Sequence, residues 1–132
     1  MTNQIIKIKN ETYGLSFWWV KAKSDDEFNT ILFKNIPTAK DQMEIDDDGT
    51  TLGETINLIH EGHNIICFWF QERNFPAMTH ELLHATIICL RIKGVKLLEE
   101  SEEAYCYLFD WLITQILKRQ CKKQPVILKN SK

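Results

Sequence analysis

The chain lacks several features that would place it in a well-marked class of proteins. Its four cysteines form no Cys-x-x-Cys pair, which argues against a cysteine zinc cluster. No apolar run approaches the roughly 18 residues that a membrane span needs. The opening residues, MTNQIIKIKN, mix charge into every short apolar stretch, unlike a signal peptide. Neither a phosphate-binding glycine loop nor a Gly-x-Ser-x-Gly elbow occurs. We therefore expect a soluble, cytoplasmic protein with no membrane partner.

An excess of one charge is also missing. The 132 residues carry 16 basic and 18 acidic side chains, for a net charge of −2, so we expect no nucleic-acid partner. The hydrophobic fraction of 44% and charged fraction of 26% are typical of a globular domain with an ordinary core. No linker, repeat or low-complexity segment divides the chain. We expect one domain over residues 1–132, with reduced cysteines buried in its core.

The N-terminal region, about residues 1–74, has the pattern of a sheet with one helix. Ser24 followed by Glu27 forms a capping box, which predicts a short helix. That helix should run over Asp25–Asn35. Alternating or β-forming residues predict strands at Ile5–Lys9, Gly14–Lys23, Ile56–Ile59 and Ile65–Phe70.

A polar stretch between these elements resembles the start of an EF-hand loop. It reads Glu44-x-Asp46-x-Asp48-Gly49, but the twelfth position, which should be a glutamate, is Thr55, and helical flanks are missing. We expect a β-turn at Asp48-Gly49 and no calcium site.

The second region, about residues 75–120, is helical. One helix should run from Phe75 to Lys93, with Pro76 in its first turn and Gly94 just past its end. Ser101 should cap a second helix that continues to about Arg119. A short basic tail, residues 121–132, follows. The expected fold is α+β: a small, mainly antiparallel sheet packed against two C-terminal helices that carry a metal site.

The first of these helices contains the motif His80-Glu81-Leu82-Leu83-His84. Histidines four positions apart project from one helix face, so both imidazoles can reach one metal ion. Glu81 can take a proton from a water held by that metal. Because the helix is apolar on nearly every side, we expect it to be largely buried, where ionisable groups need a partner such as a metal. The alternative is a pair of core histidines satisfied by ordinary hydrogen bonds.

Two histidines alone make a weak zinc site, so a third protein ligand is required. At this point the sequence resembles the gluzincin metallopeptidases, in which a second helix supplies a glutamate ligand. HELLHAT is followed by EEAYCYLFDWL, and Glu103 lies 19 positions after His84 and directly before Ala104, as in that family. The resemblance implies Zn²⁺ held by His80, His84 and Glu103. The rival for the third place is Glu102, and Glu99 and Glu100 are more distant candidates.

The second helix also departs from the family pattern. Its apolar stripe (Tyr105, Leu108, Phe109 and Leu112) still matches that pattern and leaves Glu103 on the opposite side with Tyr107, Asp110 and Thr114. Tyr107 stands where thermolysin-like enzymes carry an aspartate that orients a zinc-bound histidine, so Asp110 or a backbone carbonyl would have to give that support. No histidine follows His84, so an electrophilic partner would be Tyr105, Tyr107, His60 or His63.

The resemblance covers about residues 65–117 and implies a minimal, single-domain, zincin-like form. The chain is also similar to small HExxH proteins of unknown role encoded by tailed bacteriophages, which share the EEAYxYxxxWL stretch. In zincins an edge strand before the HExxH helix pairs with extended substrate, and Ile65–Phe70 is either that strand or an ordinary core strand. His60 and His63 bracket Gly62 in a turn, where they are either solvated or catalytic.

The sequence favours a zinc-dependent hydrolase, a metallopeptidase that uses Glu81 as general base on a peptide or protein substrate. The alternative is a non-catalytic phage structural or interaction protein that retains the zincin scaffold. A regulator that cleaves one specific partner would have the same sequence features. We expect the protein in the cytoplasm of a bacterial or phage-infected cell, or in the virion.

Overall fold

Four strands and four helices make up the part of the chain that the structure describes. The computed structural model describes residues 4–43 and 51–121, so the EF-hand-like motif and its predicted turn lie outside the described residues. The α+β class expected from the sequence is confirmed. In chain order the elements are β1 (Ile5–Asn10), β2 (Leu15–Val20), α1 (Asp25–Asn35), α2 (Ala39–Gln42), β3 (Gly53–His60), β4 (His63–Phe70), α3 (Phe75–Ile92), a 3-10 turn (Glu99–Ser101) and α4 (Glu102–Cys121).

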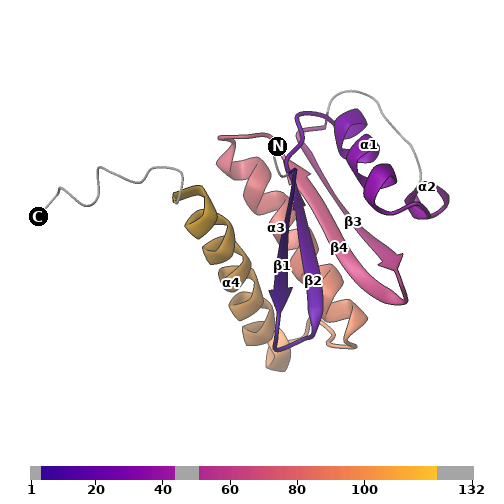
Figure 1. Ribbon diagram of the computed structural model, residues 1–132. Coiled ribbons are helices and arrows are strands. Elements are labelled where there is room, and N and C mark those ends of the chain that lie inside the picture. The colour runs from indigo at the N-terminus through magenta and orange to yellow at the C-terminus, as the bar shows by residue number, and fades with distance from the viewer. Residues whose placement is uncertain (1–3, 44–50, 122–132) are drawn as a thin grey trace, which may run out of the picture.

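The sheet has the strand order β1-β2-β4-β3 (Figure 1). The two outer pairings, β1 with β2 and β3 with β4, are antiparallel, as expected from the sequence. The central pairing of β2 with β4 is parallel and places Trp18 beside Cys67, so the sheet is mixed. A parallel neighbour requires a connection that crosses over the sheet, and α1 lies in that connection.

Strand β4 lies inside the sheet, between β2 and β3. Each residue of Ile65–Phe70 is buried, because helices cover both faces of the sheet at this strand. Of the two alternatives for Ile65–Phe70, the edge strand is therefore wrong and the core strand is confirmed. The edge strand beside the HExxH helix is β3.

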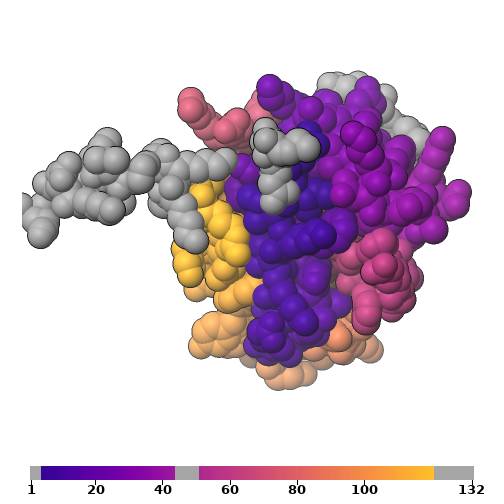
Figure 2. All heavy atoms as spheres, viewed as in Figure 1, coloured from indigo at the N-terminus to yellow at the C-terminus, as the bar shows by residue number. Residues whose placement is uncertain are grey.

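Helices cover both faces of the sheet (Figure 1). Successive strand residues point to opposite faces, so β2 and β4 contribute to two separate cores. The expected packing of the C-terminal helices against the sheet is confirmed, and α1 with α2 adds a second layer that the sequence did not predict. Phe17, Trp19, Ile66 and Phe68 pack under α3 and α4, whereas Trp18, Val20, Cys67 and Trp69 pack under α1 and α2. Figure 2 shows the first strand reaching the surface between α4 and α1.

The ends of the helices follow the local signals in the sequence. The Asn74 side chain accepts a 3.0 Å hydrogen bond from the Ala77 amide at the start of α3, and Gly94 takes a positive φ of 77° just beyond its end. Ser24 accepts a 3.1 Å bond from the Glu27 amide and caps α1 as predicted. Among the described residues, no helix combines the length and apolarity needed to cross a membrane.

Three cysteines in the described residues are free thiols. Cys67 and Cys89 are buried as expected, and burial raises the pKa of the first to about 12 and of the second to about 11. Cys106 is exposed, so for this residue the expectation of burial is wrong. It lies on the outward side of α4.

Candidate metal centre

His80 and His84 lie side by side on α3. Their Nε2 atoms are 3.2 Å apart, and the ring centroids are separated by 4.7 Å. Two zinc–nitrogen bonds of about 2.0–2.1 Å, held at a tetrahedral angle, separate their nitrogens by about 3.3 Å. This separation matches that of two ligands of one metal ion, and it is also that of a hydrogen bond between the two rings.

Both histidines are exposed, because they lie on the face of α3 that points away from the sheet. The buried face of the same helix carries Met78, Leu82 and Ala85. The helix buries the face that carries these residues, but the expected burial does not extend to His80 and His84, so the alternative of buried core histidines is wrong. A metal ion can reach these nitrogens from solvent, but burial supplies no argument that they need one.

Glu81 differs from its histidine neighbours because its side chain is only 6% exposed. The Thr55 hydroxyl of edge strand β3 donates a 2.6 Å hydrogen bond to Glu81 Oε1 and lies 3.1 Å from the Glu81 carbonyl oxygen. Gly53 leaves room for this side chain, since a Cβ there would lie 2.8 Å from Glu81 Cγ. The first residues of β3 thus hold the Glu81 carboxylate in place.

Two further carboxyl groups lie near the start of β3. Asp25 is buried and accepts a 2.8 Å hydrogen bond from the Trp69 indole nitrogen and another from the Thr51 hydroxyl. Glu54 has its pKa raised to about 7, mainly by burial and then by the charge of Asp25, its hydrogen bond with Asp25 and the charge of Glu81. Three acidic groups therefore surround the start of β3, and one of them titrates near neutral pH.

The predicted third ligand does not join the histidine pair in this structure. Within residues 4–43 and 51–121, no three His, Cys, Asp or Glu side chains lie close enough together to hold a metal ion. Glu103 and Glu102 are exposed in the first turn of α4. The buried stripe of α4 faces the core, as predicted, and it leaves Glu103 on the outward side. The role of Glu103 as ligand stays a prediction.

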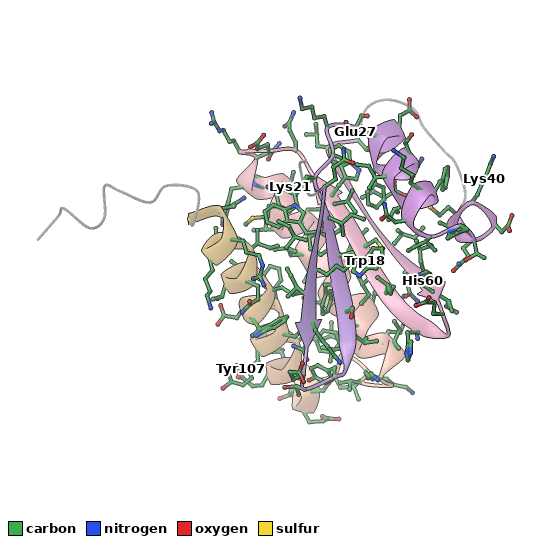
Figure 3. The ribbon with its side chains drawn as sticks, in the orientation of Figure 1. Trp18, Lys21, Glu27, Lys40, His60 and Tyr107 are labelled. Atoms are coloured by element: carbon green, nitrogen blue, oxygen red, sulfur yellow. The ribbon has the colours of Figure 1, made fainter. Side chains whose placement is uncertain are left out.

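The contacts described for the secondary candidates on α4 do not involve the histidine pair. Tyr107 is 71% exposed on the outer side of α4 (Figure 3), and Asp110 is exposed on the same outward stripe. The Tyr105 hydroxyl donates a 2.5 Å hydrogen bond to the Val95 carbonyl, so it is already engaged in fastening α4 to the preceding loop. None of these contacts supports a histidine ring.

His60 and His63 flank a two-residue turn, as predicted, and face each other across the end of the β3–β4 hairpin. The His60 ring packs against Trp18, with centroids 6.1 Å apart, and its Nε2 lies 3.8 Å from a Glu61 oxygen (Figure 3). His60 lies five positions after Thr55 along β3, which is about 16 Å. Neither histidine therefore lies beside the Glu81 carboxylate.

The residues that sequence reasoning missed are Gly53, Glu54 and Thr55. Thr55 lies 26 positions before Glu81, and nothing local to either residue indicates their contact. The role of Gly53 could be predicted in part, because a glycine inside a strand often marks the close approach of another group. Only the pairing of β3 beside α3 reveals which group that is.

Comparison with known proteins gives no independent indication of function. No protein-family profile matches the chain, and neither a curated protein nor a solved structure shows significant similarity to it. The geometry of the site and the motifs in the sequence therefore carry the functional argument.

Proposed function

We propose that the chain is a zinc-dependent hydrolase, a metallopeptidase in which His80 and His84 hold the metal. The observation that carries the proposal is the 3.2 Å separation of the two Nε2 atoms on an exposed helix face. Zinc, when bound, supplies Lewis-acid activation of water and of the scissile carbonyl. The HExxH motif adds a carboxylate next to the pair, which a purely structural zinc site does not need.

In this proposal Glu81 is the general base. It accepts the proton of the attacking water and passes it to the leaving amine. Glu103 is the proposed third ligand, and its present place on the outward side of α4 means that the connection over residues 93–101 must rearrange when metal binds. Replacement of Glu103 by alanine should therefore weaken zinc binding. An unchanged affinity would remove Glu103 from the site but leave the histidine pair in place.

The proposed substrate is a peptide or protein chain in an extended conformation. The outer edge of β3 has no strand beside it in the described sheet, and Glu81 lies against the start of this edge. An extended chain can pair with such an edge through main-chain hydrogen bonds. We place the protein in the cytoplasm of a bacterial or phage-infected cell.

A second candidate function is a non-catalytic structural or interaction protein that retains the scaffold. The observation that favours it is the buried Glu81 carboxylate, which is bound to Thr55, together with the lack of a third ligand beside the pair among the described residues. In that case zinc would bind weakly or not at all, and Glu81 would have only a structural role.

The test of the proposed function is hydrolysis of a mixed peptide library by protein loaded with zinc. We expect cleavage that a chelator abolishes and that zinc restores. Glu81→Gln should abolish cleavage while the protein keeps its fold and its metal, since the amide is isosteric and Glu81 is not a ligand. Equal product patterns from wild type and Glu81→Gln would contradict the hydrolase and favour the second candidate.

A further inference from the structure

The sheet ends in two edge strands, β1 and β3, and in the described part of the chain neither has a strand beside its outer edge (Figure 1). At β3, the Gln42 side chain accepts a 2.8 Å hydrogen bond from the Ile59 amide and donates a 2.9 Å bond to the Ile59 carbonyl. Main-chain groups alternate in direction along an antiparallel pair, so those of Gly53, Thr55 and Asn57 also point away from β4. Residues 4–43 and 51–121 offer these groups no main-chain partner. A side-chain amide therefore occupies one end of the edge, and the rest is open to another strand.

The outer edge of β1 has a similarly open main chain and carries positive charge. The Lys21 amide donates a 2.7 Å hydrogen bond to the Gln4 carbonyl, so the even-numbered residues of this strand bond with β2. By the same alternation, the main-chain groups of Ile5, Lys7 and Lys9 point away from β2. Both lysine side chains are exposed. A strand that pairs with β1 therefore meets a basic edge.

The start of β3 carries the opposite charge. Burial, then the charge of Asp25 and its hydrogen bond, and then the charge of Glu81 raise the pKa of Glu54 to about 7. None of the groups that shift this pKa is a cation. A lysine set opposite Glu54 by a neighbouring strand supplies the missing positive charge, because opposite charges across a strand pair attract.

The two edges also match in direction and in the side of the sheet that their charges occupy. β1 and β3 run the same way, because each is antiparallel to its neighbour and those neighbours are parallel to each other. A second copy in the same orientation therefore brings its β1 parallel to β3. Lys7 lies on the α1 side of the sheet, where its Nζ is 4.6 Å from the centre of the Trp18 ring, and Glu54 shares that side. With Lys7 opposite Glu54, the outward main-chain groups of Lys7 meet those of Gly53 and Thr55.

We propose that copies of this chain associate head to tail, with β1 of one copy parallel to β3 of the next and Lys7 opposite Glu54. Like charges set opposite each other destabilise a strand pair, which disfavours pairing of β1 with β1 and of β3 with β3. Lysines on an edge strand commonly prevent association, and here they restrict it to an acidic edge. Each added copy leaves one edge of either kind open, so assembly continues past the dimer unless a ring closes. The association needs no metal, and it competes with the extended substrate for β3.

The test is analytical ultracentrifugation of wild type, Lys7→Glu, Asn57→Pro and an equal mixture of the two variants. Lys7→Glu disables only the β1 edge. Asn57→Pro disables only the β3 edge, because the Asn57 amide points away from β4 and proline is tolerated at such a position. We expect wild type to form species larger than a dimer as its concentration rises, and each variant alone to stay monomeric. The mixture should stop at the dimer, since it contains one usable edge of each kind. Rising salt should weaken the association of wild type, because the lysines are exposed.

A matched control reverses a charge away from both edges. Lys34→Glu, at an exposed position of α1, changes the net charge by the same amount as Lys7→Glu and should associate like wild type. If circular dichroism shows that Asn57→Pro is unfolded, Glu54→Gln takes its place and should weaken the association of that variant alone.

Three results overturn the inference. One is wild type that stays monomeric up to its solubility limit, and another is a mixture of the variants that stays monomeric. The third is undiminished association of either variant alone, because one edge would then be sufficient. None of these measurements involves zinc, so the proposed function stands or falls separately.

Discussion

The indole nitrogen of Trp69 donates a 2.8 Å hydrogen bond to Asp25, joining two residues that are 44 positions apart. Asp25 is the first residue of α1, so this bond fastens the start of that helix to β4. A carboxylate is favourable at a helix N-terminus, and here it also accepts the Thr51 hydroxyl. Asp25 also lies near Glu54, whose pKa is raised first by burial and then by its interactions with Asp25.

The stability of the fold should therefore fall as the pH rises toward neutrality. The pKa of Glu54 is raised from 4.5 to about 7, so the folded state binds more protons than the unfolded state between these values. The contribution of protonated Glu54 is fully present below about pH 4.5 and is lost as the pH rises through 7. Urea unfolding midpoints measured from pH 5 to 8 should show this decline.

The matched control for this decline is Glu54→Gln. The amide cannot ionise, so the variant should be more stable than wild type at pH 8 and should show a flatter dependence between pH 5 and 7. Parallel curves for the two proteins would show that another group causes the decline.

Two adjacent leucines on α3 should differ sharply in their contribution to stability. Leu82 is fully buried against the sheet, whereas Leu83 is 46% exposed. Leu82→Ala should lower the free energy of unfolding by about 2–5 kcal/mol, and Leu83→Ala should change it by less than about 0.5 kcal/mol. Chemical denaturation of both variants measures the difference. Similar losses would mean that α3 does not bury the face described above.

A substitution in the turn of the β3–β4 hairpin should raise the stability of the fold. Glu61 and Gly62 both have positive φ, 52° and 80°, which the common two-residue hairpin turn requires. Asparagine tolerates this conformation better than glutamate, so Glu61→Asn should raise the unfolding free energy by up to about 1 kcal/mol. Gly62→Ala, which introduces a Cβ at positive φ, should lower it. Thermal melts of the two variants should move in opposite directions.

Much of the fold was predictable because its signals are local. Asn74 with Pro76 and Gly94 mark the two ends of α3, and Ser24 marks the start of α1. The parallel pairing of Trp18 with Cys67 was not predictable from either strand, because pairing joins residues distant in sequence. The uninterrupted apolar run of β4 did favour a central strand, but the resemblance to zincins suggested an edge.

The candidate site was predictable in part for the same reason. Spacing alone placed His80 and His84 on one helix face, and the 3.2 Å contact agrees with that. Spacing did not say that this face is exposed, because the exposed Leu83 made the helix look apolar all round. The hydrogen bond from Thr55 to Glu81 depends on how β3 lies against α3, and no local sequence pattern encodes that arrangement.

Zinc should raise the thermal stability of the protein if it binds only the folded state. At a concentration 100 times the dissociation constant, the expected gain is about 2.7 kcal/mol. His84→Ala and Glu103→Ala should lose this gain, whereas Glu81→Gln should keep it because Glu81 is not a ligand. Differential scanning fluorimetry with and without zinc compares the variants directly. Loss of the gain in Glu81→Gln would mean that Glu81 is a ligand in the resting site.

The most direct test of the central claim is X-ray absorption at the zinc edge on protein loaded with one equivalent of zinc. Two imidazole nitrogens at about 2.0–2.1 Å are expected for wild type, from His80 and His84. His84→Ala should retain little zinc after dialysis. Wild type that retains no zinc, or a histidine signal unchanged by His84→Ala, would contradict the claim that this pair is a metal centre.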